Sequence, residues 1–481
     1  MLALIVRRIC AGRAPLGGWT PLFYLWPVAV MAIGIMLFAP AAFDGERYWY
    51  SVVGHDILRT GTIPQTLGRL TFFPNNRWIP QEWLVSVATA WTLDHGIFWA
   101  LIVLEWVVLS LSFIYFVGES IRARVEPCWS TAGAIIWIVS VTGFAQLRAA
   151  AVTIPCFALL VLLRRRRSFL TSTIVMCLWA NLHGSFALGI CWLLLQLRRR
   201  GDVLPTLLAI AATLLTPLGP SLWVYPVTMA TNSAFHRVIQ EWTPTFCSID
   251  QSANWMLYML AFAFPLVGRW RLRRQIDYRQ VAIAGAVLAA SIDALRFTPL
   301  FIALFAPWLQ GIIRPQRPAR PANAWALMMV AVLVAMLVTN GHMLGYSGRL
   351  DRHFDTLEVP NGVPPSIATR ERGRRLFVDD PTNASYMESQ GAIVSIDGRF
   401  DAYDQDYVVQ VANLLGARRV GELLTHSQAQ DALLFFGEQP DKSWRLLRSG
   451  PHWKLYTRLQ ARAVSSPELR GLIGEQYSHP W

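Results

Sequence analysis

Lysine is almost absent from this sequence. Of its 481 residues, 43 are basic, and only Lys442 and Lys454 are lysines, so the other 41 are arginines. Charged residues make up only 15% of the chain, and 54% of the residues are hydrophobic. Ordinary soluble domains are about a quarter charged, so this balance argues against an ordinary cytosolic enzyme. The high apolar content also excludes disorder over most of the chain.

Cysteine is scarce as well, and the usual metal and nucleotide motifs are missing. The six cysteines include no CxxC pair, and none lies in residues 345–481. This excludes a disulfide framework and a cysteine-based metal site in that region. Neither GxGxxG nor GxxxxGK[ST] occurs, so no motif marks a pocket for a soluble nucleotide.

What the sequence does contain is long apolar runs separated by clusters of arginine. Several runs approach the ~20 residues that a membrane-spanning helix needs. The clear runs are 20–41, 98–118, 129–145, 150–163, 203–218, 254–268 and 322–344, and two interrupted stretches cover 168–197 and 279–313. This pattern predicts a mainly α-helical, polytopic membrane protein. Residues 20–41 are longer than the apolar part of a signal peptide, so we interpret them as the first helix.

The arginines predict how the chain is oriented. If each clear run crosses once and each interrupted stretch crosses twice, segments on the N-terminal side of the membrane carry 20 arginines and segments on the other side, before residue 345, carry 7. Such an excess is typical of the cytoplasmic side. The sequence therefore predicts about 11 transmembrane helices with a cytoplasmic N-terminus. The formal net charge of +13 then reflects this orientation, and not a nucleic-acid partner.

The sequence divides into two predicted domains. Residues 1–344 form the membrane domain, with a long first outer loop at 42–96, and residues 345–481 form a small extracytoplasmic α/β domain. Within the loop, the spacing of apolar residues predicts amphipathic helices at 46–60 and 81–93. In the tail we predict a helix at 417–430 and strands at 377–378, 393–396, 432–436, 444–447 and 453–456.

Acidic residues of the first outer loop are the leading candidates for chemistry. Asp44 and Glu46 lie two residues apart just after the first apolar run, and Glu82 begins the second amphipathic helix. Carboxylates placed in this way could deprotonate a hydroxyl nucleophile. Asp44 could also bind a divalent cation, Mg²⁺ or Mn²⁺. Capping of a helix or of the membrane boundary is the alternative for each. Glu105 lies within an apolar run, so we expect it to be protonated or paired.

Polar residues at the breaks of the two interrupted stretches form a second group. Asn181 and His183 mark one break, and Asp293 and Arg296 mark the other. Such breaks typically line cavities. Arg296 and His183, with Arg148 at another helix end, are candidates for binding a phosphate, since arginine holds phosphate through paired hydrogen bonds. A salt bridge from Arg296 to Asp293 is the alternative.

Two further sites complete the candidates. Glu241 lies in a second outer loop, at about 219–253, and we expect it to line the same cavity. In the tail, Asp397-Gly398-Arg399 follows a predicted strand, a common place for a site in α/β domains. An Asp397–Arg399 pair that merely fixes the loop is the alternative reading of this motif.

Taken together, the motifs resemble the GT-C class of integral-membrane glycosyltransferases, closest to its poorly characterised bacterial branch. The residues that carry the resemblance are Asp44, Gly61-Thr62-Ile63-Pro64, Gln81-Glu82-Trp83-Leu84, Asn181-Leu182-His183-Gly184, Glu241-Trp242, Arg296 and Asp397-Gly398-Arg399. Many members of the class carry an acidic pair such as DxD after the first helix, whereas this chain has Asp44-Gly45-Glu46.

The resemblance implies a function. It implies inverting transfer of a sugar from a polyprenyl-phosphate donor to an acceptor outside the cytoplasm, which is a cell-envelope glycan, lipid or protein. It also implies a multi-pass location in the bacterial inner membrane and a role for Asp44 as base or metal ligand. Two alternatives remain open: a transporter or flippase for a lipid-linked glycan, and a non-catalytic membrane scaffold in cell-surface assembly.

Overall fold

A computed structural model of the chain forms two compact units. The helical unit contains Met1–Asp44, Gln81–Ala88 and Thr92–Asp355, and the sheet unit contains Gly45–Pro80, Thr89–Trp91 and Thr356–Trp481. The residues that the structure describes are 45–122, 137, 148–165, 168–197, 199–232, 239, 242, 244, 278–294, 297, 301, 363–416, 419–435 and 439–459. The segment 45–80, which we expected in the loop of the first domain, therefore folds with the C-terminal region.

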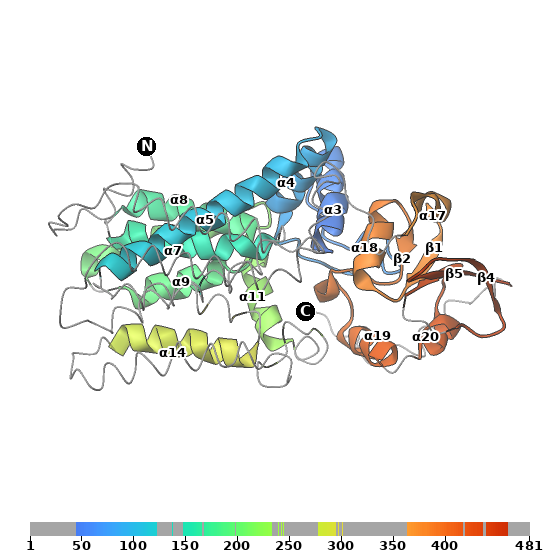
Figure 1. Ribbon diagram of the computed structural model, residues 1–481. Helices are drawn as coiled ribbons and strands as arrows, with labels where there is room; N and C mark the ends of the chain where they lie inside the picture. The colour runs from blue at the N-terminus through green and yellow to red at the C-terminus, as the bar shows by residue number, and fades with distance from the viewer. Residues whose placement is uncertain are drawn as a thin grey trace, which may run out of the picture. The chain divides into compact units, whose positions relative to one another are not determined.

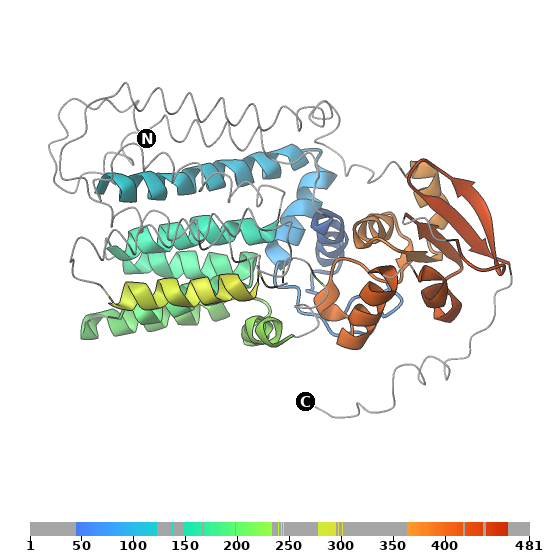
Figure 2. The ribbon, with the colours of Figure 1, turned by 60° about the horizontal axis from the view of Figure 1, so that its bottom comes forward.

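The helical unit is built from helices that pack along their lengths. They are α4 (Trp83–Asp94), α5 (Phe98–Arg122), α7 (Thr153–Arg165), α8 (Phe169–Leu182), α9 (Phe186–Leu195), α10 (Val203–Ala211), α11 (Ser221–Thr231) and α14 (Tyr278–Asp293), with short 3₁₀ turns η1 (Ala149–Val152), η2 (Arg200–Asp202) and η3 (Ala212–Leu214). Helices α5, α7, α8 and α9 run side by side (Figures 1 and 2).

A glycine allows α8 and α9 to approach each other closely. A side chain at Gly189 of α9 would come within 2.8 Å of both Met176 Sδ and the Trp179 ring of α8. Met176 and Trp179 are fully buried. The backbone of α9 therefore packs directly against side chains of α8 at this point. The turn between the two helices, at residues 183–185, is held close to the core.

The expectation of a polytopic protein with about 11 transmembrane helices is wrong. Among the residues that the structure describes, no helix is both long and apolar enough to cross a membrane. The helices from α7 to α11 run for only 9–14 residues, whereas a spanning helix needs about 20. The apolar run 203–218 shows the reason, because it is divided between α10, η3 and a turn that begins at Pro217.

The sheet unit contains a small mixed sheet with the strand order β2-β1-β3-β5-β4. The strands are β1 (Arg375–Val378), β2 (Ile393–Val394), β3 (Asp431–Leu434), β4 (Trp444–Ser449) and β5 (Lys454–Arg458), and the helices are α3 (Glu46–Thr60), α17 (Pro365–Glu371), α18 (Pro381–Ser389), α19 (Gln405–Gly416) and α20 (Val420–His426), with the 3₁₀ turn η8 (Phe400–Ala402). Strand β1 pairs in parallel with β2 and β3, and β5 pairs antiparallel with β3 and β4.

Alternating side chains of the strands bury both faces of this sheet. Leu376 and Val378 of β1 join one core with residues of α3, α17 and α18. Phe377, between them, points to the other face and joins a second core with residues of α20 and β4. Figure 1 shows α18 beside β1 and β2. Because successive residues of a strand point to opposite faces, a four-residue strand can anchor two layers.

The early segment 61–80 also completes the sheet. Thr71 forms a parallel bridge with Val394 of β2, through backbone bonds from Phe72 N to Val394 O at 2.9 Å and from Val394 N to Leu70 O at 2.9 Å. The expected α/β character of the C-terminal region is therefore confirmed, with strands near all five predicted positions. Helices α18 and α19 were not predicted, and the helix expected at 417–430 is limited to α20 in the described residues.

Candidate functional site

The turn between α8 and α9 brings the two polar motifs of the helical unit together. Helix α8 ends at Leu182, and His183 has extended backbone angles of φ −164° and ψ 144°. Asn181, on the last turn of α8, accepts a hydrogen bond from the indole of Trp83 at 3.2 Å. Its own amide donates to the carbonyls of Cys177 and Leu215. Asn181 therefore joins α8, α4 and the turn after η3.

Glu82 and His183 form a buried pair at this turn. The distance from His183 Nε2 to Glu82 Oε1 is 3.3 Å, and the two side chains are only 9% and 8% exposed. The other ring nitrogen of His183, Nδ1, lies 2.8 Å from Ser185 Oγ. A carboxylate that contacts an ordered imidazole in a buried place is the arrangement of many acid–base sites. The structure thus brings together three of the predicted site residues, Glu82, Asn181 and His183, a grouping that the sequence did not indicate.

Gln81 braces this pair from the side. Its amide nitrogen donates to Glu82 Oε1 at 3.1 Å and to the Tyr225 hydroxyl of α11 at 2.7 Å. Its amide oxygen accepts from the backbone N–H of Gly184 at 2.7 Å. The side chain of Gln81 is buried and uses both ends of its amide. It therefore fixes Glu82 relative to the α8–α9 turn and α11.

Substitution of Gly184 by Ala should disturb the site. A Cβ at Gly184 would lie 2.1 Å from Gln81 Oε1 and 2.9 Å from the Tyr225 ring, so Gln81 must move and its hydrogen bond to the turn is lost. We expect a loss of about 1–3 kcal/mol of unfolding free energy, the usual cost of overpacking. Denaturant unfolding measures it.

The control for this substitution is Gly285→Ala on α14. Nothing described lies within 4 Å of a Cβ at Gly285, and alanine favours a helix over glycine by up to about 1 kcal/mol. This variant should unfold at the same or a higher denaturant concentration than the wild type. Equal effects of the two substitutions would contradict the bracing role of Gln81.

Of the other candidates of the helical unit, Arg148 and Asp293 lie in the described residues and the rest do not. Arg148 is half-buried, and its backbone N–H donates to Glu105 Oε1 at 3.2 Å. Glu105 therefore has a backbone hydrogen-bond partner within the apolar run. Asp293 is exposed at the end of α14. The candidates Asp44, Glu241 and Arg296 lie outside the described residues.

Glu46 belongs to the sheet unit and has a local partner. It lies in the first turn of α3, and its Oε2 accepts a hydrogen bond from the Tyr50 hydroxyl one turn later at 2.6 Å. A carboxylate in the first turn of a helix is stabilised by the helix dipole. The capping alternative considered for Glu46 therefore accounts for its position.

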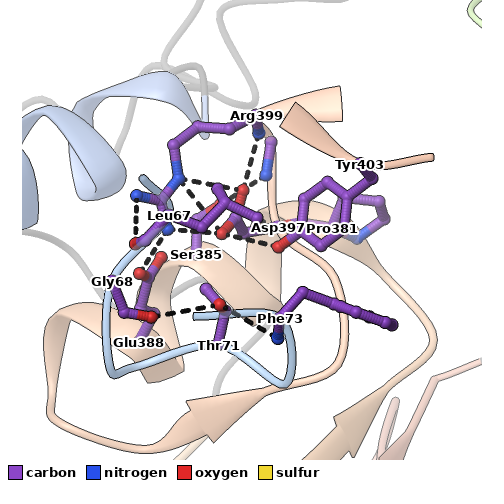
Figure 3. A network of polar contacts seen from close by, with 11 residues as sticks. Leu67, Gly68, Thr71, Phe73, Pro381, Ser385, Glu388, Asp397, Arg399 and Tyr403 are labelled. Carbon is purple, nitrogen blue, oxygen red and sulfur yellow. Dashed lines mark hydrogen bonds and ion pairs between the residues drawn. The ribbon is translucent and has the colours of Figure 1, made fainter. Parts of the chain in front are cut away.

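The tail motif is a buried ionic network. Arg399 donates to both oxygens of Asp397, at 2.6 to 3.2 Å, and to Glu388 of α18 at 2.5 Å. The Tyr403 hydroxyl donates to Asp397 at 2.9 Å, and Arg399 also reaches the carbonyl of Leu67. Figure 3 shows this one guanidinium between the two carboxyl groups.

This network indicates a structural role for the Asp397–Arg399 motif. Asp397, Glu388 and Arg399 are all at most 2% exposed, and the guanidinium also lies over the Trp78 ring, 5.2 Å from its centre. Its contacts connect α18, the turn before η8 and the segment 61–80. The motif holds the parts of the sheet unit together, which is the alternative that we had considered.

The sheet unit should lose stability as the pH rises from about 5 to 8. Burial, with Asp397 nearby, raises the pKa of Glu388 to about 8, although Arg399 opposes the shift. Burial, with Asp431 nearby, raises the pKa of Glu371 to about 8. The folded chain keeps a proton on each group that the unfolded chain releases above a pH of about 4.3. The stabilisation is therefore complete at acid pH and is lost as the pH rises towards 8.

Denaturant unfolding at pH 5, 6, 7 and 8 measures this dependence. Glu388→Gln keeps an acceptor for Arg399 and removes the titration, so its midpoint should fall less over this range than that of the wild type. The control is Glu422→Gln at an exposed position of α20, which should keep the wild-type dependence. A wild-type midpoint that rises from pH 5 to 8 would refute the assignment.

Four residues of the site were not predicted as site residues, although Gln81 belongs to a motif of the resemblance. Gln81, Ser185, Tyr225 and Thr153 complete the hydrogen bonds around Glu82 and His183. Gln81 and Ser185 stand next to predicted site residues, so their adjacency was a signal. Thr153 lies within the apolar run 150–163 and Tyr225 within the predicted second outer loop, and no motif marked them.

The described residues were also searched for a metal-binding group. Within the described ranges, no three His, Cys, Asp or Glu side chains gather into a metal-binding group. The proposed metal ligand Asp44 lies outside these ranges, so the divalent cation stays a prediction.

Compared with known proteins, the sequence matches no family model and no curated protein. The resemblance to GT-C glycosyltransferases therefore also stays a prediction, resting on the motifs alone.

Proposed function

We propose that the chain is an inverting glycosyltransferase that takes a sugar from a polyprenyl-phosphate donor. The observation that carries the proposal is the buried Glu82–His183 pair. It joins two segments about 100 residues apart in the chain, each of which belongs to a motif of the resemblance. A buried carboxylate with an ordered neighbour suits a general base for an acceptor hydroxyl.

In this reaction Glu82 accepts the proton of the acceptor hydroxyl. The hydroxyl oxygen forms a bond to the anomeric carbon of the sugar as the bond from that carbon to the phosphate oxygen breaks. Polyprenyl phosphate leaves with the electron pair, and a cation stabilises its charge. Arg148 is the described candidate for this cation. Thr153 follows Arg148 by five residues, and its hydroxyl oxygen lies 2.6 Å from that of Ser185. This end of α7 therefore lies at the α8–α9 turn.

Exposed apolar side chains of the helical unit support a lipid-linked donor. Leu170, Ile174 and Leu178 of α8 are 49–76% exposed, and Leu204, Leu207 and Leu208 of α10 are 54–66% exposed. Clustered exposed apolar residues usually mark a surface that contacts an apolar partner. A polyprenyl chain and the surrounding membrane lipids are such partners. The proposal therefore includes an association of the chain with the bilayer that holds the donor, which we assign to the bacterial inner membrane.

The test is a transfer assay with the full chain in phospholipid vesicles. Polyprenyl-phosphate esters of radiolabelled hexoses and pentoses serve as donors, and a cell-envelope fraction containing glycans, lipids and proteins serves as acceptor. We expect label in a product that no longer carries the polyprenyl phosphate. If the label crosses the vesicle membrane while still attached to its lipid, the chain is a transporter. If every donor remains unchanged and in place, the enzyme proposal is wrong.

A further inference from the structure

The neighbours of the His183 ring determine which of its nitrogens carries the hydrogen. The backbone N–H of Ser185 points at Nδ1, with a nitrogen-to-nitrogen distance of 3.1 Å. An amide N–H can only donate, so Nδ1 must offer a lone pair. On the opposite side of the ring, Nε2 faces Glu82 Oε1 at 3.3 Å. A carboxylate oxygen accepts, so Nε2 must carry the hydrogen. Both contacts select the same tautomer, with the hydrogen on Nε2.

The Ser185 hydroxyl reinforces this choice. Its oxygen lies 2.8 Å from Nδ1, 2.9 Å from the indole nitrogen of Trp179 and 2.6 Å from the Thr153 hydroxyl. The indole N–H can only donate. If the Thr153 hydroxyl also donates, the Ser185 oxygen accepts two bonds and its own hydrogen is left to point at Nδ1. Every hydrogen in the cluster then has an acceptor.

The same count argues against Ser185 as a nucleophile. Serine, histidine and glutamate in hydrogen-bonded order otherwise match the arrangement of a nucleophile, its base and an orienting acid. A nucleophilic hydroxyl oxygen attacks through a lone pair. The Trp179 indole N–H occupies one lone pair of the Ser185 oxygen, and the Thr153 hydroxyl occupies the other in the arrangement that leaves the Ser185 hydrogen for Nδ1. Ser185 therefore serves to hold the histidine.

We infer that Ser185, braced by Trp179 and Thr153, locks His183 as a hydrogen-bond donor to Glu82, which makes His183 a positioning residue and Glu82 the base. This inference rests on the proposed function, and it changes the role first expected for His183. Its two ring nitrogens are directed at Glu82 and Ser185, so we assign the donor's phosphate to other residues. A second proton on Nδ1 would face the amide hydrogen of Ser185, and the transferred proton therefore stays on Glu82.

The first test is spectroscopic and needs no substrate. The full chain carries nine histidines, and with ¹⁵N in their rings the resonances of His183 are identified by their loss in His183→Gln. At pH 7 we expect a bare Nδ1 and a protonated Nε2. A ring with its hydrogen on Nδ1, or on both nitrogens, overturns the inference. This outcome does not depend on whether sugar transfer occurs.

The second test is kinetic and compares two variants of His183. In His183→Gln the amide nitrogen takes the place of Nε2 and can still donate to Glu82, whereas His183→Ala has no donor. We expect His183→Gln to stay within about threefold of the wild-type kcat and His183→Ala to lose about 10- to 100-fold, the cost of one hydrogen bond to a charged group. The KM for the donor should not change in either variant.

A matched control and two contrary outcomes complete the design. Thr173→Ala, on α8 away from the cluster, removes only a hydroxyl bonded to the carbonyl of Phe169 and should keep the wild-type kcat. Equal losses of kcat in His183→Gln and His183→Ala would contradict the donor role. A raised donor KM with an unchanged kcat would instead return His183 to the phosphate. If the wild type transfers no sugar, the proposed function fails and the spectroscopic test alone decides the tautomer.

Discussion

Glu82→Gln should lower the kcat of sugar transfer by about 100- to 10,000-fold, the usual contribution of a general base. The substitution keeps the shape of the side chain, and the amide oxygen can still accept from His183 Nε2 and from the Gln81 amide, as Oε1 does now. The buried hydrogen bonds therefore survive. What is lost is the carboxylate that takes the proton from the acceptor hydroxyl.

The measurement is single-turnover transfer in vesicles with donor in excess of its KM. Under these conditions a change in the rate reports the chemical step and not binding. Glu422→Gln is the control, because Glu422 is exposed on α20 and its only ion pair in the described contacts is with Arg419, the residue just before that helix. It should transfer sugar at the wild-type rate.

Two variants decide between Glu82 and the acids predicted beside the first apolar run. If Asp44→Asn or Glu46→Gln abolishes transfer while Glu82→Gln stays within a few-fold of the wild type, Glu82 is not the base. The position of Glu46, bonded to Tyr50 within α3, leads us to expect little effect of its substitution. A loss of transfer in both Asp44→Asn and Glu82→Gln would mean that the two carboxylates act together.

The local parts of the site could be predicted from the sequence. The helical spacing at 46–60 and 81–93 corresponds to α3 and α4, and the polar break at 181–184 corresponds to the turn between α8 and α9. In each case the signal lies within a few residues of the feature, because helix periodicity and turn residues act over one or two turns. The positions of these two helices and of this turn were therefore predicted correctly, although their contacts were not.

The long-range pairings could not be predicted in the same way. The Gln81 amide meets Tyr225 across 144 residues of chain, and Arg399 reaches the carbonyl of Leu67 across 332 residues. Nothing near Leu67 in the sequence indicates that it belongs with a sheet that begins after residue 370. Such pairings follow from the packing of whole elements, and a single sequence does not record them.

The membrane prediction failed for a related reason. Hydropathy gives the length of an apolar run, but it does not give the length of the helix that the run forms. The run 150–163 begins with the 3₁₀ turn η1 and continues into α7, which has 13 residues. Stretch 168–197 forms α8 and α9, of 14 and 10 residues. These two stretches therefore form shorter helices joined by turns, whereas the run 98–118 lies within the single helix α5.

Arg399→Met should destabilise the sheet unit by about 3–5 kcal/mol. The substitution keeps an apolar side chain of similar length and removes the only cation that contacts Asp397 and Glu388 in the described structure. Asp397 then remains buried with a charge that only neutral donors such as Tyr403 contact. Removing one partner of a buried ion pair usually costs this much, because the remaining charge is not solvated.

Hydrogen exchange of the full chain tests this locally, since the strands β1, β2 and β3 should lose protection while α8 and α9 of the helical unit keep theirs. Arg419→Met is the matched control: Arg419 pairs with Glu422, but both side chains are at least half exposed, and a surface pair of this kind contributes at most about 1 kcal/mol. Equal protection in Arg399→Met and Arg419→Met would show that the network does not hold the unit together.

In the triple variant Arg399→Met, Asp397→Asn, Glu388→Gln the unpaired charge of Asp397 and the second carboxyl group are also gone, so much of the protection should return if the cost lies in these buried groups. If protection stays as low as in Arg399→Met, the loss comes instead from the missing contacts of Arg399 with Leu67 and Trp78.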